Sequence, residues 1–302
     1  MRIILATIGI VAISCLYSCQ KELSEKPPKL DTTSTNSSSS NGSNRLSYGD
    51  SIFYLKNQSG NYLVLPVSVP SGTGYFSANP LGLIIDSLTG RINVTQSETG
   101  LRYKIYCFTN TGQVLDSTKI VISGIDYADS IYRIQATANV YDTAFPIYNA
   151  KANPPLPCSD DDDDGEDDDG CIFDETDLND DGNDDIPGVI QEKLLVDNKK
   201  GTIDVEASYH AGVFGSNPVN GATKDFTFYY RINDASNRAL NKITVRLYHF
   251  NTINDIPQWL IDELNRRKNL STQVNSRPSN NSRVVSYEFG PKRPPIIIIV
   301  SS

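Results

Sequence analysis

Short runs of strand-forming residues follow one another from Tyr48 to about Tyr141 and constrain the fold more than any other feature of the chain. The runs are rich in Val, Ile, Tyr and Phe, and Gly, Asn, Ser and Asp separate them, as in turns. No segment of this stretch has the periodicity of a helix. The expected strands are 52–56, 62–69, 83–86, 91–94, 102–109, 117–122 and 131–139. The stretch therefore predicts an all-β domain.

About seven strands in roughly 90 residues are typical of an immunoglobulin-like (Ig-like) sandwich. Within them, Gly82 to Ile92 reads Gly-Leu-Ile-Ile-Asp-Ser-Leu-Thr-Gly-Arg-Ile, and Gly100-Leu101-Arg102-Tyr103 follows. This pattern resembles the Ig-like family with dystroglycan-type cadherin-like domains, whose repeats carry Gly-Leu, Asp, Thr-Gly and Ile before a glycine and a tyrosine. The resemblance implies an Ig/cadherin-like β-sandwich at residues 48–142, a module of adhesion proteins and spacers. Calcium-bridged cadherin behaviour is not implied, because the Asp-x-Asn-Asp-Asn motif is absent.

Within the matching pattern, Asp86 to Gly90 is expected to form a turn. Gly90 is free to adopt a positive φ there.

Residues 192–302 predict a second, mainly β domain with one helix. Apolar and polar residues alternate from Phe226 to Ile232 and from Ile243 to His249. Asp255 and Pro257 are expected to open the helix. We expect its buried face to carry Ile256, Trp259, Leu260 and Leu264. The five β-branched residues from Ile296 to Val300 suit a strand that is buried on both faces.

The N-terminal residues 1–18 predict a secretory signal peptide, because a basic residue precedes an apolar run of about a dozen residues. Such a run is shorter than the ~20 residues that a membrane-spanning helix needs. Leu16-Tyr17-Ser18-Cys19 resembles the lipobox of bacterial lipoproteins, which implies that Cys19 is lipidated and becomes the mature N-terminus. The alternative is an ordinary signal peptide.

Residues 19–47 are expected to form a flexible tether, since their Ser, Thr and Asn content cannot bury a core. The Lys-Glu pair after Cys19 resembles signals that send lipoproteins to the cell surface in some Gram-negative groups. The prediction is a protein anchored to the outer membrane through lipid and facing the cell surface.

Three cysteines remain in the predicted mature chain besides Cys19. Export places them in an oxidising compartment, so Cys158 and Cys171 are expected to form a disulfide. A loop of that size contributes ~3 kcal/mol in the chain-entropy model. Cys107 is in phase with Tyr103 and Ile105, which predicts a buried strand residue.

The net charge of −9 comes from one acidic insert, residues 160–185, with 16 acidic residues and no Lys or Arg. The rest of the chain has 27 basic and 20 acidic residues. No basic stripe interleaved with aromatic residues occurs, so no nucleic-acid partner is expected. The insert lies in a predicted disulfide-closed acidic linker, residues 143–191, between the two domains.

Within this insert, one segment matches the first, third, fifth and ninth ligand positions of an EF-hand-like loop, with Gly182 at the sixth. It resembles calcium loops of the dockerin and thrombospondin type 3 kind, although Gly188 stands at the twelfth position, where those loops have a carboxylate. Residues 160–168 match the same template. The candidate ligands are Asp177, Asn179, Asp181, Asn183 and Asp185. The alternative is a solvated acidic linker without calcium.

No pattern for catalysis is evident, and we expect a non-enzymatic protein. His210 and His249 lack a metal-binding spacing, and no nucleophile elbow, Walker or dinucleotide loop occurs. Aromatic residues at 228–230, Tyr248 and Phe250 could form a sugar-stacking surface or simply reflect strand composition.

The sequence therefore predicts a lipid-anchored surface protein for adhesion, binding or scaffolding, with a protein or glycan partner. In this interpretation calcium stiffens the link between the domains. The alternative is a glycan-binding accessory lipoprotein of a polysaccharide-uptake system.

Overall fold

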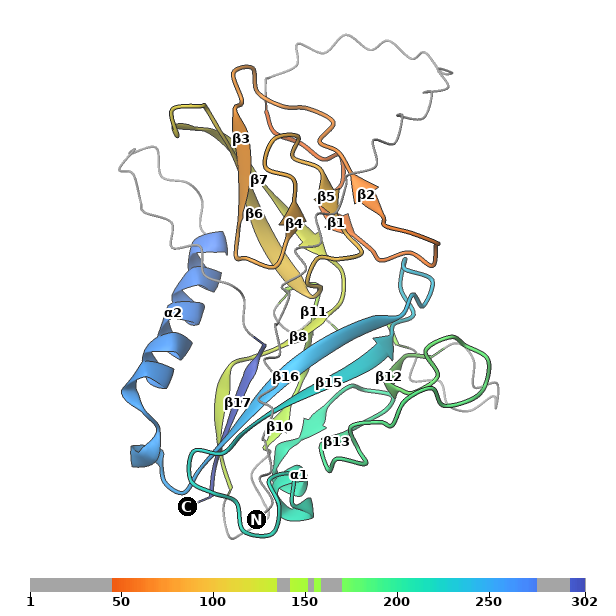
Figure 1. Cartoon of the computed structure of the whole chain (residues 1–302), viewed down its shortest axis with the longest axis vertical. Coiled ribbons are helices and arrows are strands. Elements are labelled where there is room, and N and C mark those ends of the chain that lie inside the picture. The colour runs from red at the N-terminus through yellow and green to blue at the C-terminus, as the bar shows by residue number, and fades with distance from the viewer. Residues whose placement is uncertain (1–44, 135–141, 152–154, 159–169, 276–293, 302) are drawn as a thin grey trace, which may run out of the picture. The chain divides into compact units, whose positions relative to one another are not determined.

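The computed structural model describes residues 45–134, 142–151, 155–158, 170–275 and 294–301, with the backbone alone at 269–275 (Figure 1). The predicted signal peptide, Cys19 and all but the last three residues of the predicted tether lie outside these ranges. The described chain is mainly β, as the sequence predicts. No described helix is long and apolar enough to cross a lipid bilayer.

The first domain is a sandwich of two sheets around one core. Its strands are β1 (Ile52–Phe53), β2 (Leu63–Val64), β3 (Tyr75–Asn79), β4 (Ile84–Ile85), β5 (Ile92–Asn93), β6 (Leu101–Phe108) and β7 (Val114–Ile122). One sheet has the order β1-β7-β6-β3 and the other has the order β2-β5-β4. Buried residues between the sheets include Tyr103, Ile105 and Cys107, all with no exposed surface. The prediction that Cys107 is a buried strand residue is confirmed.

The strand order of this sandwich is that of an Ig-type fold. Such folds place strands B, E and D in one sheet and C, F and G in the other, and β2-β5-β4 and β3-β6-β7 follow this division. β1 pairs in parallel with β7 at the edge. The hydroxyl of Tyr103, near the start of β6, donates to the carbonyl of Glu98 (2.8 Å), which matches the tyrosine corner of these sandwiches.

The predicted turn at Asp86–Gly90 is confirmed. Asp86 Oδ1 accepts the N–H groups of Leu88 (2.9 Å) and Thr89 (2.8 Å), and Gly90 has φ 69°. A Cβ on Gly90 would lie 3.0 Å from the Phe76 ring. Strand β3, to which Phe76 belongs, was not predicted, because Gly and Pro flank it and its five residues show little alternation.

The second domain is built on a five-stranded mixed sheet with the order β12-β15-β16-β17-β9. β17 is parallel to both of its neighbours, β16 and β9. Two small sheets, β10-β14-β13 and β11-β8, complete the domain. The strands are β8 (Ile125–Tyr127), β9 (Ser130–Arg133), β10 (Thr143–Ala144), β11 (Pro146–Tyr148), β12 (Ile172–Glu175), β13 (Leu195–Val196), β14 (Ile203–Asp204), β15 (Thr223–Arg231), β16 (Asn241–Phe250) and β17 (Ile296–Val300).

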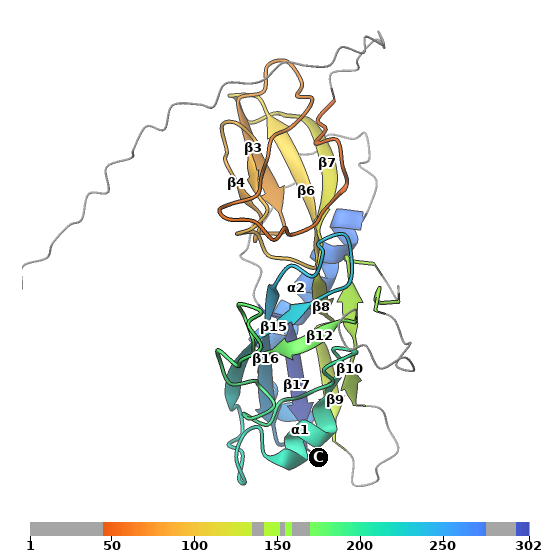
Figure 2. The ribbon, with the colours of Figure 1, turned by 90° about the vertical axis from the view of Figure 1, so that its right-hand side faces the viewer.

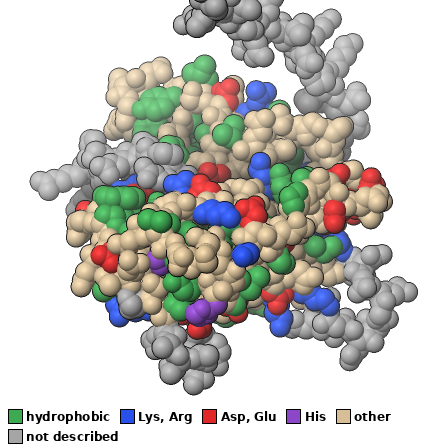
Figure 3. Space-filling model, turned by 60° about the horizontal axis from the view of Figure 1, so that its bottom comes forward, with side chains coloured by type: hydrophobic (Ala, Val, Ile, Leu, Met, Phe, Trp, Pro, Cys, Tyr) green, Lys and Arg blue, Asp and Glu red, His purple; other side chains and the backbone are tan. Residues whose placement is uncertain are grey.

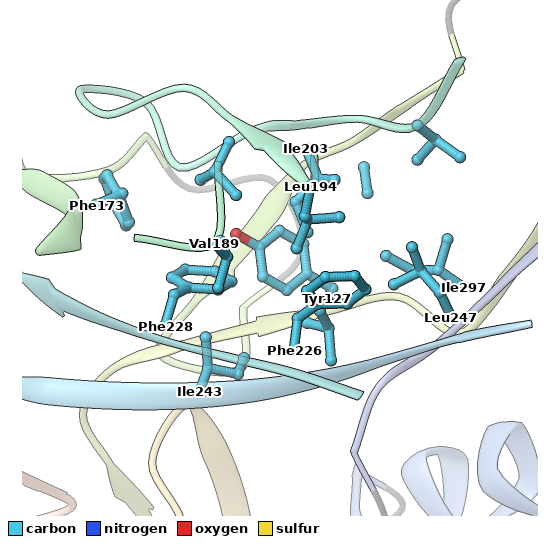
Figure 4. Close-up of a cluster of buried hydrophobic side chains, with 14 of the residues drawn as sticks. Tyr127, Phe173, Val189, Leu194, Ile203, Phe226, Phe228, Ile243, Leu247 and Ile297 are labelled. Atoms are coloured by element: carbon cyan, nitrogen blue, oxygen red, sulfur yellow. The ribbon is translucent and has the colours of Figure 1, made fainter. Parts of the chain in front are cut away.

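Each face of the five-stranded sheet is covered by a different layer. On one face, Phe226, Phe228 and Leu247 pack with residues of β8, β13 and β14 (Figure 4). On the other face, helix α2 (Gln258–Asn275) packs against Tyr248 and Phe250 of β16 and against β17. β17 contributes alternate residues to the two cores and is fully buried, so the prediction for this strand is confirmed.

The helix prediction is correct for its position but wrong for one residue. Ile256, Leu260 and Leu264 are buried, whereas Trp259 is 54% exposed and its ring makes an edge-on contact with the ring of Tyr248 (centroids 6.4 Å apart). A 3-10 turn, η1 (Ile253–Asp255), precedes α2. The short helix α1 (Val205–Ala211), capped by Asp204 and Gly212, was not predicted.

The two domains divide at a different residue from the predicted boundary. The first domain was expected to run to residue 142, but β7 leads through Ser123 and Gly124 directly into β8, and β9 joins the second sheet. A strand-rich sequence does not indicate which sheet a strand joins. As a result, the acidic insert lies between β11 and β13 in the chain, contains β12 and belongs to the second domain, in which β12 pairs with β15 (Figure 2).

Candidate functional site

The acidic loop, residues 174–188, begins in the last two residues of β12 and contains most of the described part of the acidic insert. At its base, Cys158 and Cys171 are joined by a disulfide, as the sequence led us to expect. Residues 159–169, which include most of the second calcium-loop match, lie outside the described residues. The acidic loop is therefore the part of the insert whose geometry can be compared with a calcium site.

Two carboxylates of the acidic loop accept hydrogen bonds from the loop's own backbone. Asp177 Oδ1 accepts the N–H groups of Asp180 (2.7 Å) and Asp181 (3.1 Å), and its Oδ2 accepts that of Gly182 (2.6 Å). Asp185 Oδ2 accepts the N–H groups of residues 178 (2.9 Å) and 179 (3.2 Å). Desolvation acts to raise the pKa of Asp177, but these N–H groups and nearby Arg231 outweigh it and lower the pKa.

Arg231 fixes the base of the acidic loop to the sheet. Its Nε donates to Glu175 Oε2 (3.0 Å), and both side chains are about nine-tenths buried. A terminal nitrogen of Arg231 also donates to the carbonyls of Asp177 (3.3 Å) and Leu178 (3.2 Å). The loop thus begins from a rigid, charge-paired position.

Two observations bear on calcium binding by the acidic loop. No group of three or more His, Cys, Asp or Glu side chains that could hold a metal is found among the described residues. At the twelfth position of the template, a Cβ on Gly188 would lie 2.4 Å from Asp174 Oδ2. Asp174 is held there by the N–H groups of Val189 and Ile190, so a side chain at position 188 would have to displace the Asp174 carboxylate. Calcium binding by Asp177, Asn179, Asp181, Asn183 and Asp185 stays a prediction.

A different site lies where the two domains meet, and a polar network fixes its geometry. The Tyr230 hydroxyl accepts the N–H of Ile125 (3.1 Å) and lies 3.2 Å from Thr99 Oγ1. Thr99 Oγ1 donates onward to Asn241 Oδ1 (3.0 Å). Because burial raises the pKa of Tyr230 well above its usual value, the phenol keeps its proton and can donate it to Thr99. The relay therefore connects the sandwich to β15 and β16.

Further contacts close this junction. Ser123 and Tyr148 both donate to Asp234 Oδ2, over 3.0 Å and 2.8 Å. A Cβ on Gly124 would lie 2.6 Å from the Tyr230 hydroxyl. The two domains are thus held together by directional bonds and by a contact that tolerates no side chain.

Beside this network lies a groove of about 870 Å³, which we call the junction groove. Its walls are residues 55–58 and 95–99 of the first domain, and residues 239–244 and 294–295 of the second. Tyr229 of β15 lies in its floor. Such a volume lies within the range of small-molecule sites, ~300–1,000 Å³.

The described lining of the junction groove combines polar and apolar residues with few charges. Lys56, Glu98 and Lys242 are the charged residues, nine others carry amide or hydroxyl groups, and six are apolar. On another face of the molecule, acidic and basic side chains are interspersed rather than segregated (Figure 3).

Of the aromatic residues proposed for sugar stacking, the structure leaves only one in a suitable place. Phe228 and Tyr230 are buried in the core, and Tyr248 and Phe250 lie beneath α2. Tyr229 is half-buried on the opposite side of β15 from Phe228. The sequence did not indicate the rest of the groove, because its lining comes from separate segments without a common motif.

The two histidines lie away from the groove. His249 has no exposed surface, and its ring packs against Tyr209 and Phe214, in keeping with the alternation expected from Ile243 to His249. His210 is exposed on α1, with Nε2 3.8 Å from Glu206. Comparison of the sequence with protein-family models and with curated proteins finds no match.

Proposed function

We propose that the chain is an exported surface lipoprotein that binds a protein or glycan partner without catalysing a reaction, in adhesion or scaffolding. The observation that carries this proposal is the junction groove. It is a concave, polar site, and its two sides are held in register by the Tyr230–Thr99–Asn241 relay. A preorganised site of this kind loses little conformational entropy when a partner binds.

The anchor rests on the sequence. Cys19 is lipidated, residues 19–47 tether the folded part, and the outer membrane holds the protein with its groove facing outwards. Several acyl chains hold a protein far more firmly than one. A partner at the cell surface would then meet the groove without crossing a membrane.

A role without catalysis is supported by the composition of the groove. Among the residues that the structure describes, its lining contains one carboxylate, Glu98, and neither histidine nor cysteine. General acid–base catalysis needs positioned groups that exchange protons, most often histidine or a pair of carboxylates. This lining is better suited to holding a ligand than to transforming it.

One observation favours the alternative function, a glycan-binding accessory lipoprotein beside a polysaccharide-uptake system. Tyr229 places an aromatic ring in the floor of the groove. An aromatic ring among amide and hydroxyl groups offers one apolar face and many hydrogen-bonding partners.

The test of the proposed function uses cells that carry the full-length protein. Gln96→Trp places a bulky side chain in the groove wall, and Gln113→Trp makes the same exchange at an exposed position in the β6–β7 turn. We expect adhesion to host-derived surfaces to fall at least tenfold for Gln96→Trp and to stay unchanged for Gln113→Trp. Equal adhesion of both variants would refute a role for the groove.

The anchor is tested separately. Cys19→Ser should move the protein from the outer-membrane fraction to the soluble fraction and abolish labelling with a fatty acid. External protease should degrade the native protein on intact cells. Retention of Cys19→Ser in the membrane would refute the lipid anchor, and protection from protease would refute the surface orientation.

A further inference from the structure

We infer that the junction groove binds a chain of neutral sugars, which lies across β15 and β16 with one ring stacked on Tyr229. This inference rests on the proposed function and specifies the class of its ligand. It draws on the floor of the groove, the polar groups of its walls and its charge.

The floor of the junction groove is a part of the five-stranded sheet that α2 does not cover. The five-stranded sheet has one face toward the core around Phe226 and Phe228 and the opposite face toward α2. On that opposite face, α2 covers only the part near Tyr248, Phe250 and β17. In the pairing of β15 with β16, Tyr229 lies directly opposite Lys242, and Thr227 lies directly opposite Thr244. Tyr229 therefore shares this face of the sheet with Lys242 and with Thr227 and Thr244, whose hydroxyls lie 2.6 Å apart.

The walls offer hydrogen-bonding groups of two kinds. The hydroxyl of Thr95, an exposed residue, is fixed by the backbone, since it accepts the N–H of Tyr62 (2.8 Å). For the side-chain amides of Gln58 and Gln96, the described residues provide no hydrogen-bond partner. Each amide can donate and accept, as sugar hydroxyls do. The walls thus match a ligand whose polar groups are also donors and acceptors.

The charge of the groove favours a neutral chain over an acidic one. Lys56 and Lys242 are opposed by Glu98, and the ammonium group of Lys56 lies 3.9 Å from the ring centre of Tyr62. A site for a polyanion gains most of its affinity from many cations along its length, which this lining lacks.

The backbone disfavours an extended peptide as the ligand. Peptides commonly bind by adding a strand to a free sheet edge. The floor of the groove is formed by β15 and β16, whose residues 223–230 and 241–248 are already paired with each other. A ligand here meets side chains and not an unpaired backbone.

The experiment is affinity electrophoresis of the full-length lipidated protein in mild detergent, in gels containing starch, xylan, galactomannan or mixed-linkage glucan. Polygalacturonate and hyaluronate serve as acidic probes. At least one neutral polysaccharide should retard the wild-type protein. Tyr229→Ala should weaken this binding at least tenfold, and Gln58→Ala with Gln96→Ala should weaken it several-fold.

Matched controls are Trp259→Ala, an exposed aromatic residue on α2, and Gln113→Ala, both outside the groove lining. They should bind as the wild type does. Circular dichroism and thermal melting would show that Tyr229→Ala is folded.

Three outcomes would overturn the inference: no retardation by any neutral polysaccharide, equal retardation of Tyr229→Ala and wild type, or retardation by the acidic probes alone. If Gln96→Trp still abolishes cell adhesion in any of these cases, the proposed function stands and only the ligand class fails. If adhesion is also insensitive to Gln96→Trp, both fail.

Discussion

The acidic loop and the junction groove differ in how their polar groups are used. The acidic loop has a high density of charge, yet Asp174, Asp177 and Asp185 accept hydrogen bonds from the backbone of residues 178–190. The described lining of the groove has three charged residues, and the side-chain amides of Gln58 and Gln96 have no hydrogen-bond partner in the described chain. Charge density alone therefore does not mark a binding site; polar groups left available around a concave surface are the better indicator.

The largest expected loss in free energy of unfolding follows from a substitution at the base of the acidic loop. Arg231→Ala would leave Glu175 buried without its partner, and removing one member of a buried ion pair costs about 3–5 kcal/mol. Urea denaturation of the full-length protein would measure the loss in free energy of unfolding. Arg246→Ala is the control, since the Arg246–Asp225 pair is partly exposed and should contribute at most about 1 kcal/mol. Similar losses for both variants would contradict a special role for Arg231.

A smaller effect is expected at the junction. Tyr230→Phe removes the hydroxyl that accepts the Ile125 N–H and bonds Thr99, and leaves buried polar groups unpaired at a cost of about 1–3 kcal/mol. Binding to the groove should weaken in the same variant, because Thr99 and Asn241 line it. Tyr75→Phe should change stability by less than about 0.5 kcal/mol. Unchanged ligand binding by Tyr230→Phe would show that binding in the groove does not depend on the Tyr230–Thr99–Asn241 relay.

Titration with calcium tests whether the acidic loop is a calcium-binding site. With a dissociation constant of about 1 mM, typical of extracellular sites, 10 mM calcium would stabilise the protein by about 1.4 kcal/mol. Calorimetric titration should show the corresponding heat, and Asp177→Asn with Asp185→Asn should abolish it, while Asp50→Asn on the sandwich surface should not. If the wild-type protein gives no heat with calcium, the acidic loop is a solvated segment and not a calcium site.

The smallest effect concerns the acid side of the stability profile. The pKa of Asp177 is lower in the folded protein than in the unfolded chain, so its contribution to stability is present above its unfolded pKa of about 3.9 and is lost as pH falls through the folded value. Asp177→Asn should therefore make the decline in stability below about pH 4 shallower. Carbon NMR of the Asp177 carboxyl would show its midpoint directly. A midpoint at or above 3.9 would contradict the role of the loop's N–H groups.

Local patterns predicted much of the fold. Alternation identified β15 and β16, the β-branched run identified β17, and Asp86 to Gly90 identified a turn. What failed depended on distant partners. The assignment of β9 to the second sheet is set by β17, and the exposure of Trp259 is set by how α2 meets the sheet.

The candidate sites also differ in whether residues close in the sequence could reveal them. The disulfide and the acidic segment could be located from the sequence, because the cysteines and carboxylates are close in the chain. The junction groove could not, since residues 55–58, 95–99, 239–244 and 294–295 meet only in the folded protein. Tyr229 was the one groove residue among the predicted aromatic candidates, and nothing local distinguished it from Tyr230.

The placement of β17 has a consequence for how the protein is made. Ile296–Val300 is synthesised long after β9 and β16, yet it lies between them and supplies residues to both cores. Until it emerges, β9 has no partner in the sheet, and the second domain cannot close. The second domain is thereby completed only late in synthesis, and a chain truncated before Ile296 would lack the strand that joins β9 to β16.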